Sequence, residues 1–290
     1  MFKGKSAVID VGSNSVRLMM SESGQTLYKQ VIITRLAEGY SEKGLLTQDA
    51  MDRTVIAISQ LVEKASLEKA DKLFIFATAA VRNSKNKNEF IEKVYNACGI
   101  KVEVISGQLE AQLGYVGALN GKDGGVIDIG GASTEITVRN GDNTSYSKSV
   151  YVGVVSLRNA CGQDEKLLEE FINEKIVQYG KIPKTQFYGI GGTVTSVASV
   201  MQGLEVYDAN KVNGYVIFLE QLKELKNRVF AMSERERENI VGLQKGRANV
   251  FAGGILLLIK LMQKLGVDKI IVSERDNLEG YLTLKENIGE

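Results

Sequence analysis

The chain has 290 residues, of which 44% are hydrophobic and 24% charged, and its formal net charge is +1. These values are typical of a soluble globular protein with one large or two ordinary domains, and a charge this close to zero excludes capture of nucleic acid or an anionic membrane by a global field. The absence of His excludes Ser-His-Asp and Cys-His catalysis, so acid–base work falls to carboxylates, Lys, Tyr or bound water.

In chain order, the spacing of apolar residues predicts alternating strands and helices, which is typical of an α/β protein. Strands are expected at 6–11, 16–20, 27–33, 73–77, 102–105, 126–129, 134–138, 186–190 and 269–272. Helices are expected at 47–70, 88–97, 109–119, 164–179, 193–201, 219–232 and 247–265. Thr47 is the expected N-cap of the first helix, and Gly99 is expected to end the second.

Targeting signals and reactive cysteines are not evident. Cys98 and Cys161 lack metal-ligand spacing, and we expect two reduced thiols packed as small hydrophobes. Residues 1–5 carry no signal-peptide pattern, and the longest apolar stretch, Phe251 to Leu258, is too short to span a bilayer. We therefore expect a cytoplasmic enzyme that has neither DNA nor a membrane as a partner.

An internal repeat stands out along the chain. Aligning Asp10 with Asp128 superposes the octamers that begin at Val8 and Val126, with agreement at six of eight positions when Val and Ile count as equivalent. A strand that ends in a small-residue turn directs successive backbone N–H groups toward one point, which makes an anion-binding nest. Either loop alone is well explained as an ordinary tight turn with an Asx cap, but the pair favours a duplicated phosphate-binding lobe.

The two aspartates of the repeat point to a cation. Asp10 and Asp128 would repel a bare phosphate, so the expected partner of each is a divalent cation or a water that bridges to phosphate. Glu135 follows the second loop closely, which favours a metal or water site shared with Asp128. The alternative for Glu135 is an exposed carboxylate on a strand face. A third small-residue turn, Gly191–Thr193, lies between a predicted strand and a predicted helix and is also typical of phosphate binding.

Two further residues could carry chemistry. Glu110 lies in the first turn of the predicted helix 109–119, where it is either a carboxylate favoured by the helix dipole or a general base that activates water. Periodicity does not decide between these. Arg17 and Arg82 could each bind phosphate bidentately, and Arg82 is favoured because it lies at a strand-to-helix junction.

The motif set resembles the exopolyphosphatase / guanosine pentaphosphate phosphatase (Ppx/GppA) family, and the resemblance covers nearly the whole chain. The matching segments are Asp10–Ser15, Thr78–Arg82, Ile105–Ala111, Asp128–Glu135, Gly191–Thr193, Gly242–Asn249, Val272–Glu274 and Glu279–Gly280. The resemblance implies two ribonuclease-H-like lobes of the actin-like, sugar-kinase superfamily with an interdomain cleft. We expect these lobes at residues 1–120 and 121–290, with the last helix a candidate to pack back on the first lobe.

The resemblance also implies site residues, matched position by position. Catalytic roles fall to Glu110, Arg82 and Glu135. Metal-binding roles fall to Asp128, Glu135 and Asp10. Phosphate-binding roles fall to Ser13, Asn14, Ser15, Gly130, Gly131, Ser133, Thr134, Gly191, Gly192 and Thr193. The implied cofactor is Mg²⁺ or Mn²⁺, with a monovalent cation as a further candidate, and a homodimer is implied as well.

The implied activity is hydrolysis of the terminal phosphate of linear polyphosphate, by in-line attack of a water that Glu110 activates. Guanosine pentaphosphate is the rival substrate. More distant alternatives are a small-molecule kinase of the same superfamily and a non-catalytic sensor of polyphosphate or of a nucleotide alarmone. The chain departs from the family pattern at Leu109, where a first Glu is usual, at Ala132, where a Gly is usual, and at Asp276–Leu278, where Gly-Leu-Arg is usual.

Overall fold

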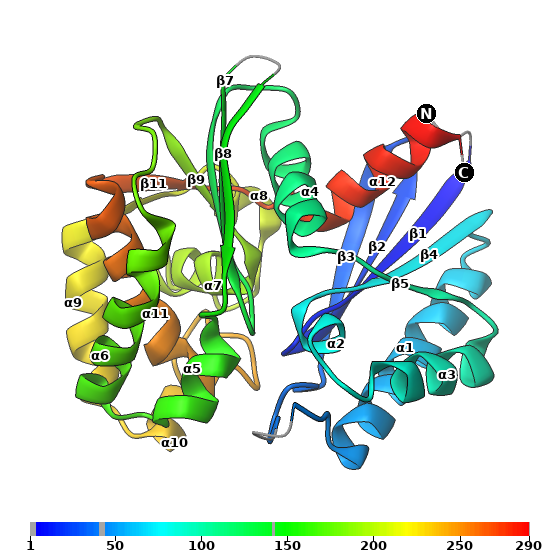
Figure 1. Cartoon of the computed structure of the whole chain (residues 1–290), viewed down its shortest axis with the longest axis horizontal. Coiled ribbons are helices and arrows are strands. Elements are labelled where there is room, and N and C mark those ends of the chain that lie inside the picture. Colours follow the sequence, from blue (N-terminus) through cyan, green and yellow to red (C-terminus); the bar gives the residue numbers. More distant parts are fainter. Residues whose placement is uncertain (1–3, 41–43, 141–142, 290) are drawn as a thin grey trace. The chain divides into compact units, whose positions relative to one another are not determined.

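The computed structural model describes residues 4–40, 44–140 and 143–289, and the chain divides into two compact units (Figure 1). Unit 1 comprises Met1–Gly117 and Asn277–Glu290, and unit 2 comprises Ala118–Asp276. The boundary expected from the sequence, between residues 120 and 121, lies close to the boundary of these units, and the last helix, a candidate to pack back on the first lobe, groups with unit 1. Both units are α/β, as predicted.

Unit 1 is built on a five-stranded sheet of order β3-β2-β1-β4-β5. Its strands are β1 (Lys5–Val11), β2 (Ser15–Glu22), β3 (Gln25–Ile33), β4 (Lys72–Ala77) and β5 (Val102–Val104). The first three strands pair antiparallel, and β4 and β5 continue the sheet in parallel with β1. This is the strand order of a ribonuclease-H-like lobe, so the expected fold is confirmed for unit 1.

Helices cover both faces of this sheet. The helices are α1 (Gln48–Leu67), α2 (Ala79–Arg82), α3 (Lys87–Cys98), α4 (Gly107–Leu119), which contains the unit boundary, and α12 (Asn277–Ile288). Thr47 caps α1 by accepting a hydrogen bond from the Ala50 amide, and Gly99 ends α3 in the left-handed conformation, with φ of 71°, as predicted. On one face, α4 and α12 share a buried apolar cluster with the strands, while α1 and α3 pack together on the other (Figure 1).

The last helix is held in unit 1 by polar contacts as well as by apolar packing. Lys29 Nζ lies 2.9 Å from Glu279 Oε2, and Lys285 Nζ lies 3.1 Å from Glu103 Oε2. The Tyr281 hydroxyl donates to the same Glu103 oxygen at 2.6 Å, and its ring stacks on Phe76. These contacts join α12 to β3, β4 and β5, which are distant from it in sequence.

The contacts of Glu103 predict a small pH dependence of stability. Burial alone would raise the pKa of Glu103, but hydrogen bonds from Tyr281 and Lys285 and the charge of Lys285 outweigh it, so the pKa lies below its usual range. A depressed carboxyl pKa stabilises the fold above the unfolded-state value of about 4.3, and that contribution is lost as pH falls through the folded-state pKa.

We therefore expect Glu103→Gln to lower the free energy of unfolding at pH 7 by roughly 0.5 kcal/mol, a small effect because the side chain is partly solvated. The difference between wild type and variant should shrink as pH falls below about 4. Urea unfolding at pH 7 and pH 3.5 measures it. A difference that grows toward low pH would contradict the assignment.

Unit 2 repeats the same plan on a six-stranded sheet of order β10-β11-β9-β6-β7-β8. Its strands are β6 (Gly124–Ile129), β7 (Thr134–Asn140), β8 (Asn143–Val150), β9 (Phe187–Ile190), β10 (Val216–Phe218) and β11 (Lys269–Val272). Three antiparallel strands, β8-β7-β6, are followed by parallel β9 and β11, and antiparallel β10 adds an edge. The duplication predicted from the octamer repeat thus extends to the order and direction of the five strands β8-β7-β6-β9-β11, which match β3-β2-β1-β4-β5.

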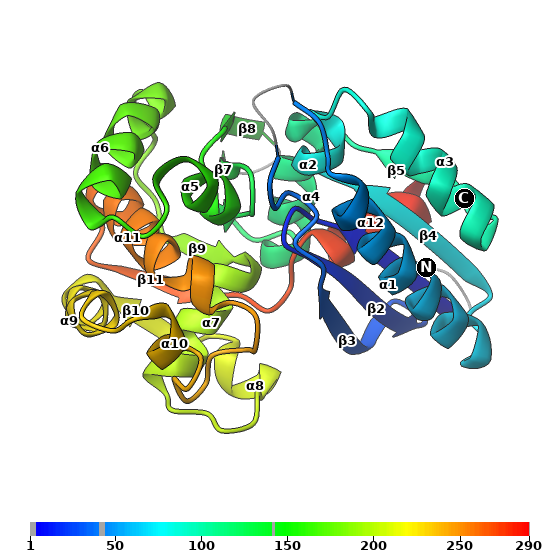
Figure 2. The same ribbon diagram turned by 90° about the horizontal axis from the view of Figure 1, so that it is seen from below.

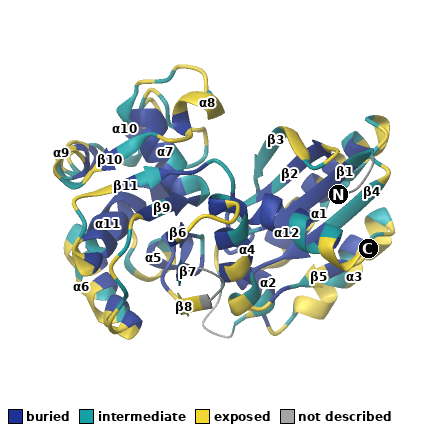
Figure 3. Cartoon of the chain, turned by 90° about the horizontal axis from the view of Figure 1, so that it is seen from above, coloured by how far each residue is buried: buried dark blue, intermediate teal, exposed yellow. Residues whose placement is uncertain are grey.

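The helices of unit 2 surround a nearly fully apolar helix, α11 (Ala248–Leu265). The others are α5 (Val154–Cys161), α6 (Glu165–Ile176), α7 (Gly191–Met201), α8 (Ala209–Val212), α9 (Leu219–Phe230) and α10 (Glu234–Arg237), with a 3-10 turn at Val177–Tyr179. By length and composition alone α11 could cross a membrane, contrary to the expectation that the apolar stretch is too short, but 78% of it is buried inside the protein. The helix packs against α5, α6 and α9 (Figure 2), and most of it is dark blue in Figure 3, as in a core helix.

Candidate active site

The first phosphate-type loop lies between β1 and β2 of unit 1. The Gly12 amide donates to the Ser15 carbonyl at 3.0 Å, which closes the turn. Asp10 and Arg17 are cross-strand partners, and Arg17 donates to Asp10 Oδ2 through Nε at 3.0 Å and through Nη2 at 2.5 Å. A cation at Asp10 would therefore compete with this guanidinium, which makes Asp10 a weaker metal ligand than the sequence implied.

The tip of this loop is buried, and hydrogen bonds from the segment after β3 hold it in place. Ser13 and Asn14 are almost fully buried. The Asn14 carbonyl accepts from the amides of Thr34 and Arg35, and the Ser13 carbonyl accepts from the Ala37 amide. Within the described part of the chain, Asn14 Nδ2 has no hydrogen-bond partner. The loop thus keeps a buried donor that suits an anion.

Glu110 and Arg82 form an ion pair in unit 1. Arg82 Nη1 donates to Glu110 Oε2 at 2.7 Å and to the Ile105 carbonyl at 3.0 Å. Glu110 is 6% exposed and lies in the first turn of α4, where Ser106 Oγ accepts from the Leu109 amide and caps the helix. The guanidinium fixes the orientation of the carboxylate, as a positioned base requires.

The first loop and this ion pair belong to the same edge of the sheet. Arg82 follows β4 and Glu110 follows β5, and both strands run parallel to β1. The Thr78 amide, at the start of α2, donates to the Val11 carbonyl at 3.2 Å. Ligands of open α/β sheets bind at the carboxyl ends of the strands, so unit 1 gathers its predicted residues where such a site is expected.

The second loop, between β6 and β7, is built against the start of α5. The Gly130 carbonyl accepts from the Val154 amide, and the Gly131 carbonyl accepts from the Val155 and Ser156 amides. Because a trans peptide points its N–H opposite to its C=O, the amides of Gly131 and Ala132 point away from α5. Gly153 permits this approach, since an added Cβ there would lie 2.6 Å from the carbonyl oxygens of Gly130 and Gly131. The loop therefore presents a backbone nest for an anion.

The hydroxyls of this loop are engaged within the protein. Ser133 Oγ donates to Glu135 Oε1 at 2.7 Å, and Thr134 Oγ1 donates to the Val152 carbonyl at 2.6 Å. Any phosphate at this loop would thus be bound chiefly by backbone N–H groups. Ser133 and Thr134 were predicted to be phosphate ligands, but in this geometry both hydroxyl groups already donate hydrogen bonds within the protein.

Glu135 is buried, contrary to the alternative of an exposed strand-face carboxylate. It is 2% exposed, and its Oε1 accepts from Ser133 Oγ and from Ser149 Oγ at 2.5 Å. Burial and the negative charge of Glu135 raise the pKa of Tyr179, whose hydroxyl donates to the Thr134 carbonyl. Asp128 is the cross-strand partner of Glu135, so the two side chains lie on the same face of the sheet.

These two carboxylates fit a Mg²⁺ ion that keeps water or phosphate ligands. Mg²⁺ is bound in enzymes through one or two carboxylates together with substrate phosphate and water. Among residues 4–40, 44–140 and 143–289, no group of three or more His, Cys, Asp and Glu side chains is close enough to hold a metal alone. Asp128 and Glu135 are the better candidates, because the Oδ2 atom of Asp10 is already bound by Arg17.

The third turn joins β9 to α7 in unit 2. Gly191 has a φ of 83°, and a Cβ there would lie 2.9 Å from Asp128 Oδ1, so this glycine and Asp128 are neighbours. Gly192 lies beneath the Arg247 guanidinium, which a Cβ would approach to 2.3 Å. Arg247 belongs to the segment Gly242–Asn249, which resembles a family motif but has no predicted site role. The structure adds it to Asp128, the glycine loop and the helix N-terminus of α7.

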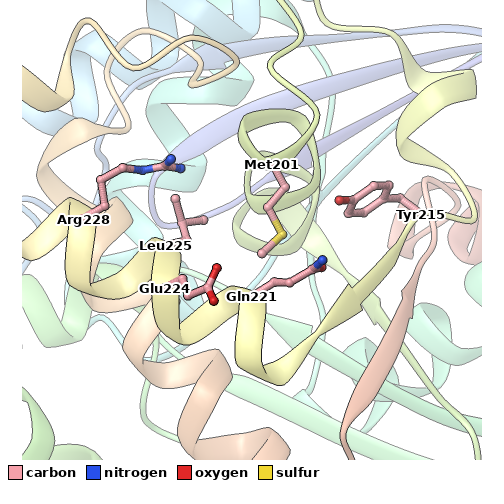
Figure 4. Close-up of a pocket in the computed structure, with 6 residues that line it drawn as sticks. All are labelled: Met201, Tyr215, Gln221, Glu224, Leu225 and Arg228. Carbon is pink, nitrogen blue, oxygen red and sulfur yellow. The ribbon is translucent and has the colours of Figure 1, made fainter.

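A separate hollow lies at the opposite end of α7. It has a volume of about 190 Å³ and is shown in Figure 4. Its lining residues are Met201, Tyr215, Gln221, Glu224, Leu225 and Arg228. The predicted site residues of unit 2 lie at the start of α7 or on β6 and β7, so this hollow includes none of them.

Comparison with known proteins identifies the class. Residues 14–287 match the Ppx/GppA phosphatase family, and the chain belongs to this family. The chain is 30% identical, over 95% of its length, to the bifunctional 3-dehydroquinate synthase/phosphatase of Fusobacterium nucleatum, of which it spans only 46%. It is 28% identical over 94% of its length to exopolyphosphatase 2 of Mycobacterium tuberculosis, of which it spans 96%.

Other relatives carry a different name. The chain is 30% identical, over 95% of its length, to a guanosine-5'-triphosphate,3'-diphosphate pyrophosphatase of Photobacterium profundum, of which it spans 58%. Among solved structures, the Aquifex aeolicus member of the Ppx/GppA family is 29% identical, with a TM-score of 0.78 and coverage of 98% and 99% of the two chains. The structure of an exopolyphosphatase-like protein reaches a TM-score of 0.90 at 22% identity, which supports the fold.

Proposed function

We propose that this protein is an exopolyphosphatase, which hydrolyses the terminal phosphoanhydride bond of linear inorganic polyphosphate. The observation that carries the proposal is the buried Glu110–Arg82 ion pair at the edge of the sheet where the Asp10–Ser15 loop lies. The Mycobacterium tuberculosis relative that the chain spans almost end to end supports the choice of substrate.

Different residues of this chain carry different steps of the proposed reaction. Glu110 accepts a proton from the attacking water, and Arg82 keeps the carboxylate oriented for that transfer. The Gly131 and Ala132 amides and the α7 N-terminus bind phosphate oxygens. Asp128 and Glu135 would hold Mg²⁺, which supplies neutralisation of phosphate charge. Catalysis of phosphoryl transfer depends mainly on positioning the reacting groups and on stabilising the charge of the phosphate, and these groups provide both.

Guanosine pentaphosphate is the second candidate substrate, because the Photobacterium profundum relative is named for a guanosine-5'-triphosphate,3'-diphosphate. Both substrates present a terminal phosphoanhydride to the same groups. A non-catalytic sensor remains an alternative in view of Leu109, where one carboxylate of the family pattern is missing. Homodimer formation, a monovalent-cation requirement and a cytoplasmic location stay predictions.

The test is phosphate release from long-chain polyphosphate and from guanosine pentaphosphate, at equal enzyme concentration with Mg²⁺ and with excess EDTA. We expect faster release from polyphosphate, abolished by EDTA. Faster release from guanosine pentaphosphate would select the second substrate. Binding of either compound without any phosphate release would select the sensor and reject the hydrolase.

A further inference from the structure

The turn that follows β3 is hydrogen-bonded to the first phosphate-type loop. The amides of Thr34 and Arg35 donate to the Asn14 carbonyl at 3.0 and 2.9 Å, and the Ala37 amide donates to the Ser13 carbonyl at 2.9 Å. Any group on this turn that faces the loop is therefore held at a fixed place relative to Asn14.

The two hydrogen-bonded segments carry three buried polar atoms without partners. Within the described part of the chain, Asn14 Nδ2, Thr34 Oγ1 and Arg35 Nε form no hydrogen bond. Asn14 is 6% exposed and Thr34 is 1% exposed. Buried polar atoms are nearly always paired, so a cluster of unpaired ones on two adjoining segments calls for a ligand. Two of the three atoms only donate and the Thr34 hydroxyl can donate as well, which suits an anion.

Arg35 also adopts a backbone conformation that favours glycine. Its φ is 51°, which few non-glycine residues adopt. Ser23, Lys69 and Asn120 share such a φ among the described residues, so the conformation alone assigns no role to Arg35. It does make glycine a replacement free of backbone strain at this position.

The local charge is positive. Arg35 Nη1 lies 3.9 Å from Glu38 Oε1, while Arg53 Nη2 lies 3.3 Å from Glu38 Oε2. One carboxylate thus faces two guanidinium groups. Arg53 makes a second hydrogen bond, because its Nε donates to the Thr34 carbonyl. In the part of the chain that the structure describes, Arg35 Nε has no hydrogen-bond partner, and the Arg35 side chain is 39% exposed. Guanidinium groups bind phosphate oxygens bidentately.

The same turn reaches the helix that carries Arg82. The Tyr40 hydroxyl donates to the Asn83 carbonyl at 2.8 Å, and Asn83 is the C-cap of α2. The turn therefore borders both parts of the predicted site of unit 1. A ligand beside Arg35 and Asn14 would lie next to the phosphate loop.

We propose that Arg35 and Asn14 form an additional phosphate subsite in unit 1, which binds a phosphate group of the substrate other than the one attacked. This inference rests on the proposed function and deepens it. The ligand class is a linear chain of phosphates. Because the subsite binds a group remote from the reacting bond, it contributes to substrate affinity and leaves the chemical step unchanged.

The test compares Arg35→Gly with Lys69→Gly, a matched control in the same unit. Lys69 is also a cation at positive φ, 60°, but it follows α1 and has no contact with the loop among those described. Both changes remove one positive charge at a position that glycine accepts without strain. Both variants should therefore keep or raise the midpoint of urea unfolding.

We expect Arg35→Gly to raise KM for long-chain polyphosphate about tenfold, the effect of losing one charge-assisted hydrogen bond, with kcat within about twofold. Lys69→Gly should change neither, and Arg35→Lys should retain part of the affinity. Equal changes in the two glycine variants, or a fall in kcat at unchanged KM, would overturn the subsite. A KM increase confined to guanosine pentaphosphate would overturn its assignment to a phosphate chain.

A binding measurement separates this inference from the proposed function. Calorimetric titration with a methylene-bridged triphosphate, which is not hydrolysed, should show a Kd about tenfold weaker for Arg35→Gly than for wild type. If wild type releases no phosphate from polyphosphate but this difference is found, the hydrolase proposal fails and the subsite stands. If the Kd is unchanged, the subsite is wrong whatever the reaction.

Discussion

Replacing Glu110 by Gln is expected to lower kcat for phosphate release from long-chain polyphosphate about a thousandfold, with KM within about twofold. Gln has nearly the same shape and retains an oxygen for the 2.7 Å contact with Arg82, but it does not accept the proton of the attacking water. Initial rates of phosphate release with Mg²⁺ measure the effect.

Glu103→Gln is the matched control. Glu103 is also a carboxylate of unit 1 that pairs with a cation, Lys285, but it joins α12 to β5 and lies outside the predicted site. Its activity should remain within about twofold of wild type. If Glu110→Gln keeps near-wild-type turnover, Glu110 is not the base. If both variants lose activity equally, the loss reflects disturbed packing of unit 1.

Gly280→Ala is expected to destabilise unit 1 by about 3 kcal/mol. A Cβ at Gly280 would lie 2.0 Å from the Leu113 carbonyl oxygen and 2.7 Å from its carbonyl carbon. These are backbone atoms of α4, so relief requires α12 to move away from α4. Such a movement opens the apolar cluster that contains Leu278 and Tyr281.

Urea unfolding followed by circular dichroism measures this change. Gly253→Ala is the control: Gly253 lies in buried helix α11, but the nearest side-chain atom to its Cβ would be 3.6 Å away. That substitution should be neutral or stabilising, because alanine favours a helix. Unfolding midpoints that match between Gly280→Ala and wild type would show that α12 and α4 are not packed as described.

Elements with strong periodicity or clear end signals were predictable from sequence. Helices α1 and α11 and the strands that carry the repeat lie close to the predicted ranges. Strand β8 was not predicted, because Asn143–Val150 is rich in exposed polar residues and lacks an apolar strand pattern. It forms a strand because it pairs with β7. Helix α5 begins with two valines, which favour strands, and it forms because its N-terminus is bonded to the Gly130–Gly131 loop.

The site was predictable where one unit gathers strand ends. Arg82 and Glu110 follow neighbouring parallel strands, so their adjacency follows from topology. The burial of Glu135 was not predictable from the sequence. Ser149 on β8 donates a hydrogen bond to Glu135, and Tyr179 lies close enough for the Glu135 charge to raise its pKa. Neither residue was predicted to be a neighbour of Glu135. Arg247 was missed as a site residue because only the packing of its guanidinium over Gly192 reveals the contact.

The membership of α12 in unit 1 bears on the order in which the protein acquires its structure during translation. Residues 118–276 form one continuous stretch that contains the whole sheet of unit 2, and α12, which completes unit 1, leaves the ribosome after them. Until then the nascent unit 1 exposes the apolar face that Val8, Met19 and Phe76 share with α12, which is a surface that chaperones bind. The helix that carries Glu110 reaches its final packing only when Gly280 meets Leu113, so we expect a chain without α12 to be inactive.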